Sequence, residues 1–507
     1  MTRGRLVVHA HFYQPSRSDP FTGRIPREPT AAPFHDYNEK ILAECYKPNA
    51  DRDNLDRISW DLGPTLASWL AQADEATYQR FLAADRPSDG TERGNAIAQA
   101  YHHTILPLAS LADRRTEIRW GLRDFELRFG RPSLGFWLPE TAVDLPTLRL
   151  LAEEGVTYTI LAPWQAADPH IETRRPYRIP LGSGHSIIAV FYDGPLSGAV
   201  SFDSAATSDA HQFVRRWLEP RFAEPMDGPD SVDGPSAAAA PPASPPRGRA
   251  TAARIAVARP DAESPLVVIA SDGELYGHHQ KFRDLFLQRL VGADGRPVPG
   301  DFDVVPLADA LLDPAARPFR TTRLQERTSW SCLHGVLRWT AECPDVPDGR
   351  WKGPLRAAFE RLAAGIDAVT DRLLVDVIDR DQFAAARDAY VDVIFGAEKP
   401  GAFASRWLPD ARADIDRERF LTLLEALRWR LAMFASDGWF WEDPARIETR
   451  QVLRAAAKAS RMVDAIAGSA LEHRLLEDLT LLTSPADHTD GVAIYREALE
   501  EVGQPVS

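Results

Sequence analysis

The sequence predicts an α/β fold built on parallel strands and followed by a helical domain. Short apolar runs alternate with helical patterns as far as Val305, as in a parallel barrel or a doubly wound sheet. Two of the runs end in carboxylates, at Glu140 and at Asp272. Parallel α/β folds keep their chemistry at the carboxyl ends of their strands, so both acids are candidate site residues. Either acid could instead cap the helix that follows it.

Composition limits the classes of partner. The chain has 507 residues, enough for two or three domains, and a net charge of -14 that argues against a nucleic-acid or anionic membrane surface. No stretch approaches the ~20 apolar residues of a membrane span. The three cysteines lack CxxC spacing, so we expect neither a disulfide framework nor a cysteine zinc site, and a reducing cytoplasm fits best. The oligomeric state stays open.

The first strand is predicted at Leu6-Val7-Val8, and it runs directly into His9-Ala10-His11-Phe12-Tyr13-Gln14. Side chains two apart in a strand share a face, so His9 and His11 point the same way. Such a pair can bind a metal or hydrogen-bond the hydroxyl groups of a substrate. Residues 16–54 are predicted to form a long functional loop above the site.

The remaining elements follow in order. Residues 59–66 are predicted to open a helix, 95–111 and 121–129 are predicted to be helical, and Trp120 is expected to end a short strand. Beyond the strand that ends at Trp137, a helix is expected at 145–154, because Gly155 suits its C-terminal cap. Apolar and β-branched patterns predict further strands at 156–161, 177–180 and 186–192, a helix at 210–218, and a strand at 265–270.

The composition changes abruptly between residues 224 and 263, where Pro, Ala and Gly dominate. Such a segment buries too little apolar surface to offset its ordering entropy, so we expect residues 226–260 to be a disordered insertion. His278 then precedes a helix at 281–290, and 302–306 is the last predicted strand. From Leu355 onward, apolar residues recur at three- and four-residue spacings. We therefore expect a barrel over 1–315 and a helical domain over 316–507 that contributes to the active-site cleft.

Four stretches, taken together, resemble the signatures of glycoside hydrolase family 57, in the branch that carries the DUF3536 region. They are His9-Ala10-His11 with Gln14-Pro15, Trp137-Leu138-Pro139-Glu140, Asp272-Gly273-Glu274-Leu275-Tyr276-Gly277, and the segment from Trp330 to Trp339. A further stretch, Ser436-Asp437-Gly438-Trp439-Phe440, is similar to an element that the helical domain of family branching enzymes brings to the sugar site.

The resemblance implies an incomplete (β/α)7 barrel followed by a helical domain. It also implies a retaining glycosidase or transglycosylase that acts on α-glucan-like substrates without a cofactor, with Glu140 as nucleophile and Asp272 as general acid and base. Expected substrate-binding residues are His9, His11, Gln14, Trp137, Glu274, His278, Trp330, Trp339, Asp437 and Trp439. Trp330 is the better candidate for stacking on a sugar, and Trp339 fits a core position equally well.

Retaining cleavage sets requirements for the two acids. The carboxyl groups must lie about 5–5.5 Å apart, which two neighbouring strand ends can supply. The nucleophile must be ionised, so we expect hydrogen-bond donors around Glu140, with His9 and His11 as candidates. A nearby ionised Glu140 would raise the pKa of Asp272, as an acid requires. Glu274 is expected to orient groups rather than react.

Two alternatives remain at this stage. A metal-dependent carbohydrate deacetylase would also use strand-end residues, and His9, His11 and Asp272 could hold a divalent ion. That chemistry has no need of the Trp137-to-Glu140 element. A carbohydrate-binding barrel without turnover is the other alternative, and the presence of both acids counts against it. The choice between hydrolysis and transfer depends on whether water or a sugar hydroxyl reaches the glycosyl-enzyme.

Overall fold

The computed structural model describes residues 3–85, 93–223, 264–311, 319–408 and 414–505. The predicted insertion at 226–260 and the predicted domain boundary near residue 315 both lie outside the described residues. The division of the chain at that boundary therefore stays a prediction.

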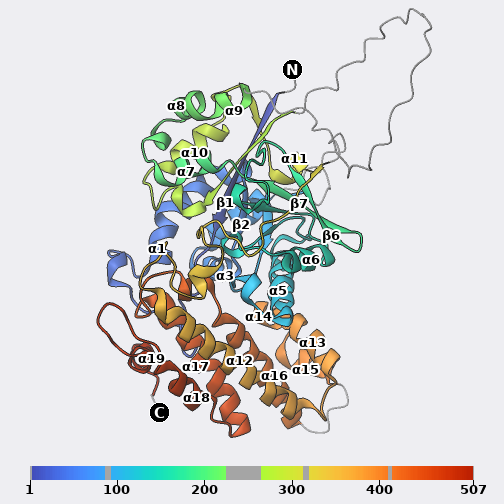
Figure 1. Cartoon of the computed structure of the whole chain (residues 1–507), viewed down its shortest axis with the longest axis vertical. Helices are drawn as coiled ribbons and strands as arrows, with labels where there is room; N and C mark the ends of the chain where they lie inside the picture. Colours follow the sequence, from blue (N-terminus) through green and yellow to red (C-terminus); the bar gives the residue numbers. More distant parts are fainter. Residues whose placement is uncertain (1–2, 86–92, 224–263, 312–318, 409–413, 506–507) are drawn as a thin grey trace, which may run out of the picture.

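A curved parallel sheet forms the N-terminal part of the chain (Figure 1). Strands β4, β3, β2, β1 and β8 lie side by side in that order, and every pair is parallel. A bridge between Gly135 and Tyr158 brings β5 beside β4, and β7 pairs with β5 in parallel. The Asp193 amide donates to the Val268 carbonyl at 2.8 Å, so the end of β7 meets β8. The predicted α/β fold with an incomplete barrel is confirmed. The strands of the ring are β1 (Gly4–Phe12), β2 (Ser59–Leu62), β3 (Ala96–Gln99), β4 (Phe136–Trp137), β5 (Tyr158–Leu161), β7 (His185–Phe191) and β8 (Leu266–Asp272).

Strand β1 shows how the sequence sets the two faces of the sheet. Leu6, Val8 and Phe12 are fully buried in the apolar cluster that packs beneath the outer helices. Val7 belongs instead to the separate cluster that contains Trp137. Because side chains alternate along a strand, His9 and His11 share the inner face with Val7.

Helices cover the outside of the sheet, and shorter strands extend it. The helices are α3 (Pro64–Ala73), α4 (Glu75–Ala84), α5 (Leu111–Phe129), α6 (Leu145–Glu153), α7 (Gly194–Phe202), α8 (Ala210–Phe213), α9 (Glu219–Ala223), α10 (Arg283–Val291) and α11 (Leu307–Leu311). The additional strands are β6 (Tyr177–Gly182), β9 (Phe302–Val304) and β10 (Arg320–Thr321). Among the described residues, no helix has the length and apolar character needed to cross a bilayer.

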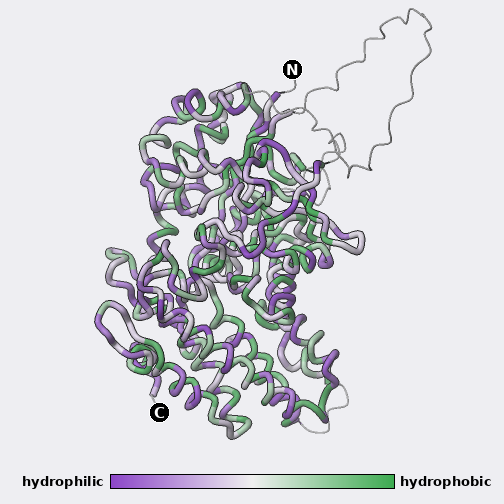
Figure 2. Tube along the Cα trace, in the orientation of Figure 1, coloured by the Kyte–Doolittle hydropathy of each residue, from purple (hydrophilic) through white to green (hydrophobic). Residues whose placement is uncertain are grey.

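The C-terminal part is helical, as predicted, and its helices alternate apolar and polar residues along their length (Figure 2). Its helices are α12 (Lys352–Leu374), α13 (Arg380–Ala389), α14 (Val391–Phe395), α15 (Pro400–Trp407), α16 (Asp414–Ala432), α17 (Ile447–Ala467), α18 (Leu471–Leu479) and α19 (Gly491–Glu500). Their buried faces form one apolar cluster that also takes in Trp120 from α5. The Trp120 indole donates to the Arg387 carbonyl at 2.9 Å, so the helical part is joined to the barrel there.

Several predicted elements were wrong, and each error has a local cause. Residues 95–111 were expected to be helical, but Ala96–Gln99 is strand β3, because a short strand buried on both faces lacks alternation and resembles a helix segment. Residues Ser59–Leu62 form strand β2 before the helix begins at Pro64. Trp120 lies inside α5 rather than in a strand. The loop at 16–54 contains two short helices, α1 (Tyr37–Ile41) and α2 (Lys47–Asp51).

Candidate functional site

Three polar residues occupy one level across the ends of three neighbouring strands. In the register of the sheet, His11 of β1 is paired with Asp61 of β2 on one side and with Asp272 of β8 on the other. Paired residues of parallel strands point to the same face, so these side chains meet inside the mouth of the barrel. The register thus builds a row in which a histidine lies between two carboxylates.

Asp61 holds both histidines. Its Oδ1 lies 3.0 Å from His9 Nε2 and its Oδ2 lies 2.7 Å from His11 Nδ1, and all three residues are buried. Burial lowers the pKa of His9 below its usual value. Burial also acts to lower the pKa of His11, but the charge of Asp61 and its hydrogen bond outweigh that effect and raise the pKa to about 9. At neutral pH this shift favours the protonated, positively charged form of His11.

Glu140 follows the end of β4 in a single turn of 3-10 helix, Pro139–Thr141, and its φ of 56° places it in the left-handed region. Trp330 Nε1 and Ser331 Oγ both donate to its Oε2, at 3.1 and 2.6 Å. The Trp330 amide also donates to the Glu140 carbonyl at 3.1 Å. The segment that carries Trp330 thus fixes both the backbone and the carboxylate of Glu140.

The prediction that His9 and His11 donate hydrogen bonds to Glu140 was wrong. His9 and His11 bind Asp61 instead, and the carboxylate is held by Trp330 and Ser331. Burial raises the pKa of Glu140, the Ser331 hydrogen bond lowers it, and the charge of Asp272 raises it again. The two acids are therefore close enough to interact electrostatically.

Asp272 and Glu274 differ in their surroundings. The Asp272 side chain is accessible to solvent from the barrel mouth. The surrounding strand ends still shield it from bulk water, and this shielding raises its pKa. The charge of His11 lowers that pKa and the charge of Asp61 raises it, so the pKa moves in the expected direction through burial and Asp61 rather than through Glu140. Glu274 is buried, and burial raises its pKa to about 7 although the Tyr46 hydroxyl donates to it at 2.6 Å.

Aromatic rings line the inner wall of the barrel mouth. Trp137 is fully buried and stacks against His9 and His11, with ring centroids 5.0 and 4.8 Å apart. Trp330 meets Trp137 edge to face at 5.0 Å. Trp137 therefore supports the two histidines from behind, while Trp330 is partly exposed beside Glu140.

The helical part brings Asp437 to the barrel mouth through the turn Ser436–Trp439. Tyr13 donates its hydroxyl proton to Asp437 Oδ2 at 2.6 Å, and its ring stacks on His103 at 3.7 Å. His103 Nδ1 lies 2.7 Å from the Ser436 hydroxyl, and its Nε2 lies 3.2 Å from His11 Nε2. Burial raises the pKa of Asp437 to about 7, and the charge of Glu140 adds to this shift.

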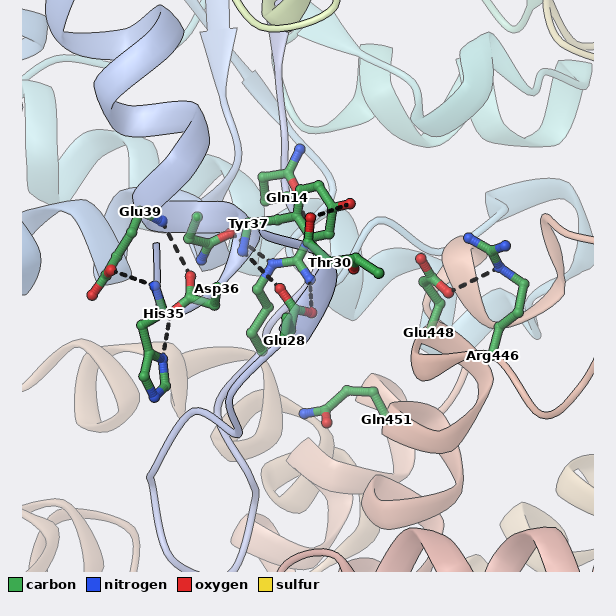
Figure 3. Close-up of polar contacts among 12 residues, drawn as sticks. Gln14, Glu28, Thr30, His35, Asp36, Tyr37, Glu39, Arg446, Glu448 and Gln451 are labelled. Carbon is green, nitrogen blue, oxygen red and sulfur yellow. Dashed lines mark hydrogen bonds and ion pairs between the residues drawn. The ribbon is translucent and has the colours of Figure 1, made fainter. Parts of the chain in front are cut away.

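A cleft of about 1100 Å³ opens between the loop after β1 and the helical part. Three of the expected substrate-binding residues, Gln14, His278 and Asp437, line it. Figure 3 shows Gln14 on the barrel side and Arg446 with Glu448 on the opposite, helical side. Gln14 accepts a hydrogen bond from Arg17 at 2.9 Å, so its amide oxygen already has a partner in this structure.

The other seven expected substrate-binding residues, and the acids Glu140 and Asp272, are not among the residues that line this cleft, and two of the seven lie in the core of the helical part. Trp339 and Trp439 are both 0% exposed and belong to the core of the helical part. The Trp439 indole donates to the Lys352 carbonyl at 3.3 Å. Neither ring presents a face to a sugar in this structure, because each sits in an apolar run whose neighbours pack in the same core.

Sequence reasoning missed several residues of the site. Asp61 was placed in a helix, although an aspartate inside a short apolar strand pattern is itself a signal of function. Tyr13 and His103 form the stack that joins the barrel to the helical part. Gln99, at the end of β3, is buried with neither amide atom hydrogen-bonded. Ser331 follows the predicted Trp330 directly, and only the fold shows that its hydroxyl reaches Glu140.

The deacetylase hypothesis predicted a metal set of His9, His11 and Asp272. Within the described ranges, these three residues do not belong to any group whose ligand atoms lie close enough together to share one ion. Both histidines are oriented by Asp61 instead. The predicted ligand set is therefore not assembled.

Comparison with known families decides the relationship. Residues 70–293 match the sequence model of glycosyl hydrolase family 57, and residues 348–502 match a domain of unknown function, DUF3536. The chain therefore contains a region that matches glycosyl hydrolase family 57. The family match includes Glu140 and Asp272, and the DUF3536 match includes Asp437 and the helices around it. No curated protein has a sequence that matches this one.

Solved structures share the fold of this chain. An exo-type maltose-forming amylase from Pyrococcus sp. ST04 has a TM-score of 0.66 at 15% identity, with 98% of this chain and 88% of that chain covered. A family 57 branching enzyme from Thermococcus kodakaraensis has a TM-score of 0.56 at 16% identity, with 99% and 95% covered. An α-amylase from Thermotoga maritima has a TM-score of 0.53 at 15% identity, with 98% and 99% covered. At these identities the similarity shows the fold.

Proposed function

We propose that this chain cleaves or transfers α-glucosidic bonds through a covalent glycosyl-enzyme, with Glu140 as nucleophile and Asp272 as general acid and base. One arrangement supports the proposal most strongly: two carboxyl groups from separate elements interact with each other and with the His11 cation. Retaining glycosidases need such a pair of acids. The α-glucan substrate class is supported by the family and by the amylases and branching enzyme with the same fold.

The first step forms a bond and breaks a bond. A Glu140 oxygen attacks the anomeric carbon, the glycosidic C–O bond breaks, and Asp272 gives its proton to the leaving oxygen. The donors from Trp330 and Ser331, together with the charge of His11, favour the ionised form of Glu140 that this attack requires.

The second step releases the sugar. Formation of the glycosyl ester removes the negative charge of Glu140, and with it the repulsion between the two carboxylates. Asp272 can then take a proton from water or from a sugar hydroxyl that attacks the anomeric carbon. Water gives hydrolysis, and a sugar hydroxyl gives transfer.

Incubation of the purified chain with a panel of α-glucans tests this function. We expect α-1,4-linked oligosaccharides or polysaccharides to yield either new reducing ends or transferred products, with the α configuration kept at the anomeric carbon. The configuration is measured by NMR on the first products formed. Products of inverted configuration would contradict the retaining mechanism, and undiminished activity in Glu140→Gln would contradict the role of Glu140 as nucleophile.

Trp441 tests whether the cleft binds the chain of the substrate. Its side chain is 39% exposed, it lines the cleft, and the Arg446 guanidinium lies 4.3 Å from its ring centroid. Removing one aromatic contact of about 0.5–1.5 kcal/mol should raise KM for long α-glucans by about 2–10-fold. We expect a smaller change for a short oligosaccharide, in kinetics measured side by side.

Trp217→Ala is the matched control, because Trp217 packs on the barrel cluster and is not part of the cleft lining. An equal rise in KM for short and long substrates in Trp441→Ala would show that the cleft does not hold the extended chain.

A further inference from the structure

Four potential metal ligands meet beside the segment that holds Glu140. They are Cys332, His334, Cys343 and Asp345, and all their ligand atoms lie within 4.8 Å of one another. The two sulfurs are 3.4 Å apart, the Cys343 sulfur is 3.5 Å from His334 Nδ1, and that nitrogen is 3.3 Å from Asp345 Oδ2. We propose that these residues bind one structural zinc ion.

The distances fit tetrahedral coordination. Zinc bonds of about 2.3 Å to sulfur and about 2.0–2.1 Å to nitrogen or oxygen require about 3.8 Å between two sulfurs in a tetrahedron. The same bond lengths require about 3.6 Å between sulfur and nitrogen and about 3.3–3.4 Å between nitrogen and oxygen. The three observed separations differ from these edges by a few tenths of an ångström at most.

The backbone brings the ligands together in two pairs. Cys332 and His334 are two residues apart, as are Cys343 and Asp345, and a bridge between Cys343 and Val346 closes the second pair into a turn. Gly335 has a φ of 78° between them, and a Cβ there would lie 2.4 Å from the Arg327 carbonyl, so the turn requires glycine. The Leu333 amide donates to Asp345 Oδ2 at 2.9 Å and orients the carboxylate.

The charges around the cluster suit a bound ion. Two thiolates, one carboxylate and a neutral histidine around Zn²⁺ carry a net charge of -1, and binding releases the two thiol protons. Lys352 is fully buried, and its charge interacts with both cysteines. Its positive charge offsets part of the net negative charge of such a site.

A disulfide between the two cysteines explains less of the cluster. The sulfurs are not bonded in this structure, and a disulfide would leave the approach of His334 and Asp345 without a role. CxxC spacing is absent from the sequence, and for this reason the sequence predicts no cysteine zinc site. The C-x-H and C-x-D pairs supply the ligands instead.

A bound zinc ion would stabilise the segment that supports the Glu140 carboxylate. Ser331 and Trp330 immediately precede Cys332, and both donate to Glu140. The Ser329 hydroxyl donates to the Gly335 carbonyl at 2.8 Å, so the same short segment spans both the acid and the cluster. Zinc therefore fixes a loop that the fold ties to the barrel mouth.

Metal analysis of the whole chain tests the proposal. Protein produced in zinc-containing medium and desalted into metal-free buffer should retain about one zinc per chain, measured by elemental mass spectrometry. Cys332→Ser and Cys343→Ser should lose it. Cobalt added to the metal-free wild type should give a thiolate-to-cobalt absorption band that both variants lack.

The two exposed ligands keep the test decisive if the cysteine variants fail to fold. His334→Ala and Asp345→Asn should each weaken zinc binding by more than about 100-fold, because loss of even an outer-shell partner costs about 10–100-fold. His473→Ala and Asp487→Asn, at exposed positions on the helical part, are matched controls that should keep the zinc.

Three results would overturn the proposal. They are a wild-type chain that binds neither zinc nor cobalt, an isolated protein with Cys332 and Cys343 joined as a disulfide under reducing purification, and zinc that remains in both cysteine variants. Metal content does not depend on glycosidase activity, so failure of this proposal is distinguishable from failure of the proposed function.

Discussion

Glu140→Gln is expected to reduce turnover on every α-glucan by about 10⁴-fold or more, the range seen when a nucleophile is removed. Glutamine keeps the shape of the side chain and can still contact Trp330 Nε1 and Ser331 Oγ through its amide oxygen. It lacks the charge that attacks the anomeric carbon, so the glycosyl-enzyme cannot form. Initial rates on a soluble glucan measure the loss, and Glu126→Gln, on the exposed side of α5, is the control.

Glu140→Gly separates loss of chemistry from loss of structure. Residue 140 has a φ of 56°, a left-handed conformation that costs a non-glycine residue of order 1–3 kcal/mol and costs glycine almost nothing. We therefore expect this variant to melt no lower than Glu140→Gln. Added azide can occupy the emptied position and should restore cleavage of an activated glycoside with inverted product. Rescue with retained configuration would show that another residue is the nucleophile.

The sequence predicts the fold well where local patterns carry the information. The strand that ends in Asp272 and the helix around Leu362 are both confirmed, since each has a clear apolar run or a clear helical period. Strand β3 was missed because four buried residues carry no period that separates a strand from a helix. Whether such a segment is a strand or a helix is decided by its length and by the strands that pair with it, and both are known only from the folded sheet.

The site was predictable only in its individual groups. Glu140, Asp272 and His11 follow from strand ends and motif spacing, but the partner of His11 is set by the register between β1 and β2. Ser331 reaches Glu140 across 191 residues of sequence, a contact that no local pattern encodes. The histidines were therefore assigned to the wrong carboxylate, although the residues themselves were correctly chosen as part of the barrel mouth.

The cluster around Cys332 and Cys343 is a second group of residues that the sequence alone does not bring together. A spacing rule recognises ligands that are adjacent in the sequence, whereas Cys332 and Cys343 are eleven residues apart and meet through a turn at Gly335. The chain must fold before the two pairs become one site. Spacing alone gave no reason to group a histidine and an aspartate with them.

Asp272→Asn should separate substrates by their leaving groups. On α-glucans the departing sugar oxygen needs a proton, so loss of the acid should slow glycosylation by about 10²–10⁴-fold. An aryl α-glucoside with a strongly acidic phenol departs without protonation, and its glycosylation step should slow by less than about 10-fold. Asp301→Asn, at an exposed site 98% accessible, is the control.

The measurement must separate the two steps, because Asp272 also serves as the base that activates the incoming water. In Asp272→Asn we expect a rapid burst of phenol followed by slow turnover, since the glycosyl-enzyme forms and then waits for a weak nucleophile. Azide needs no base and should speed the slow phase, giving a product of retained configuration.

The wild-type profile of kcat/KM against pH should fall on the basic side as Asp272 loses its proton, and burial shifts that fall to higher pH than for an ordinary aspartate. This basic limb should be absent from the burst rate of Asp272→Asn. Equal losses on all leaving groups, or an unchanged basic limb, would remove Asp272 from the acid role and leave Glu274, whose pKa is about 7, as the next carboxyl group to test.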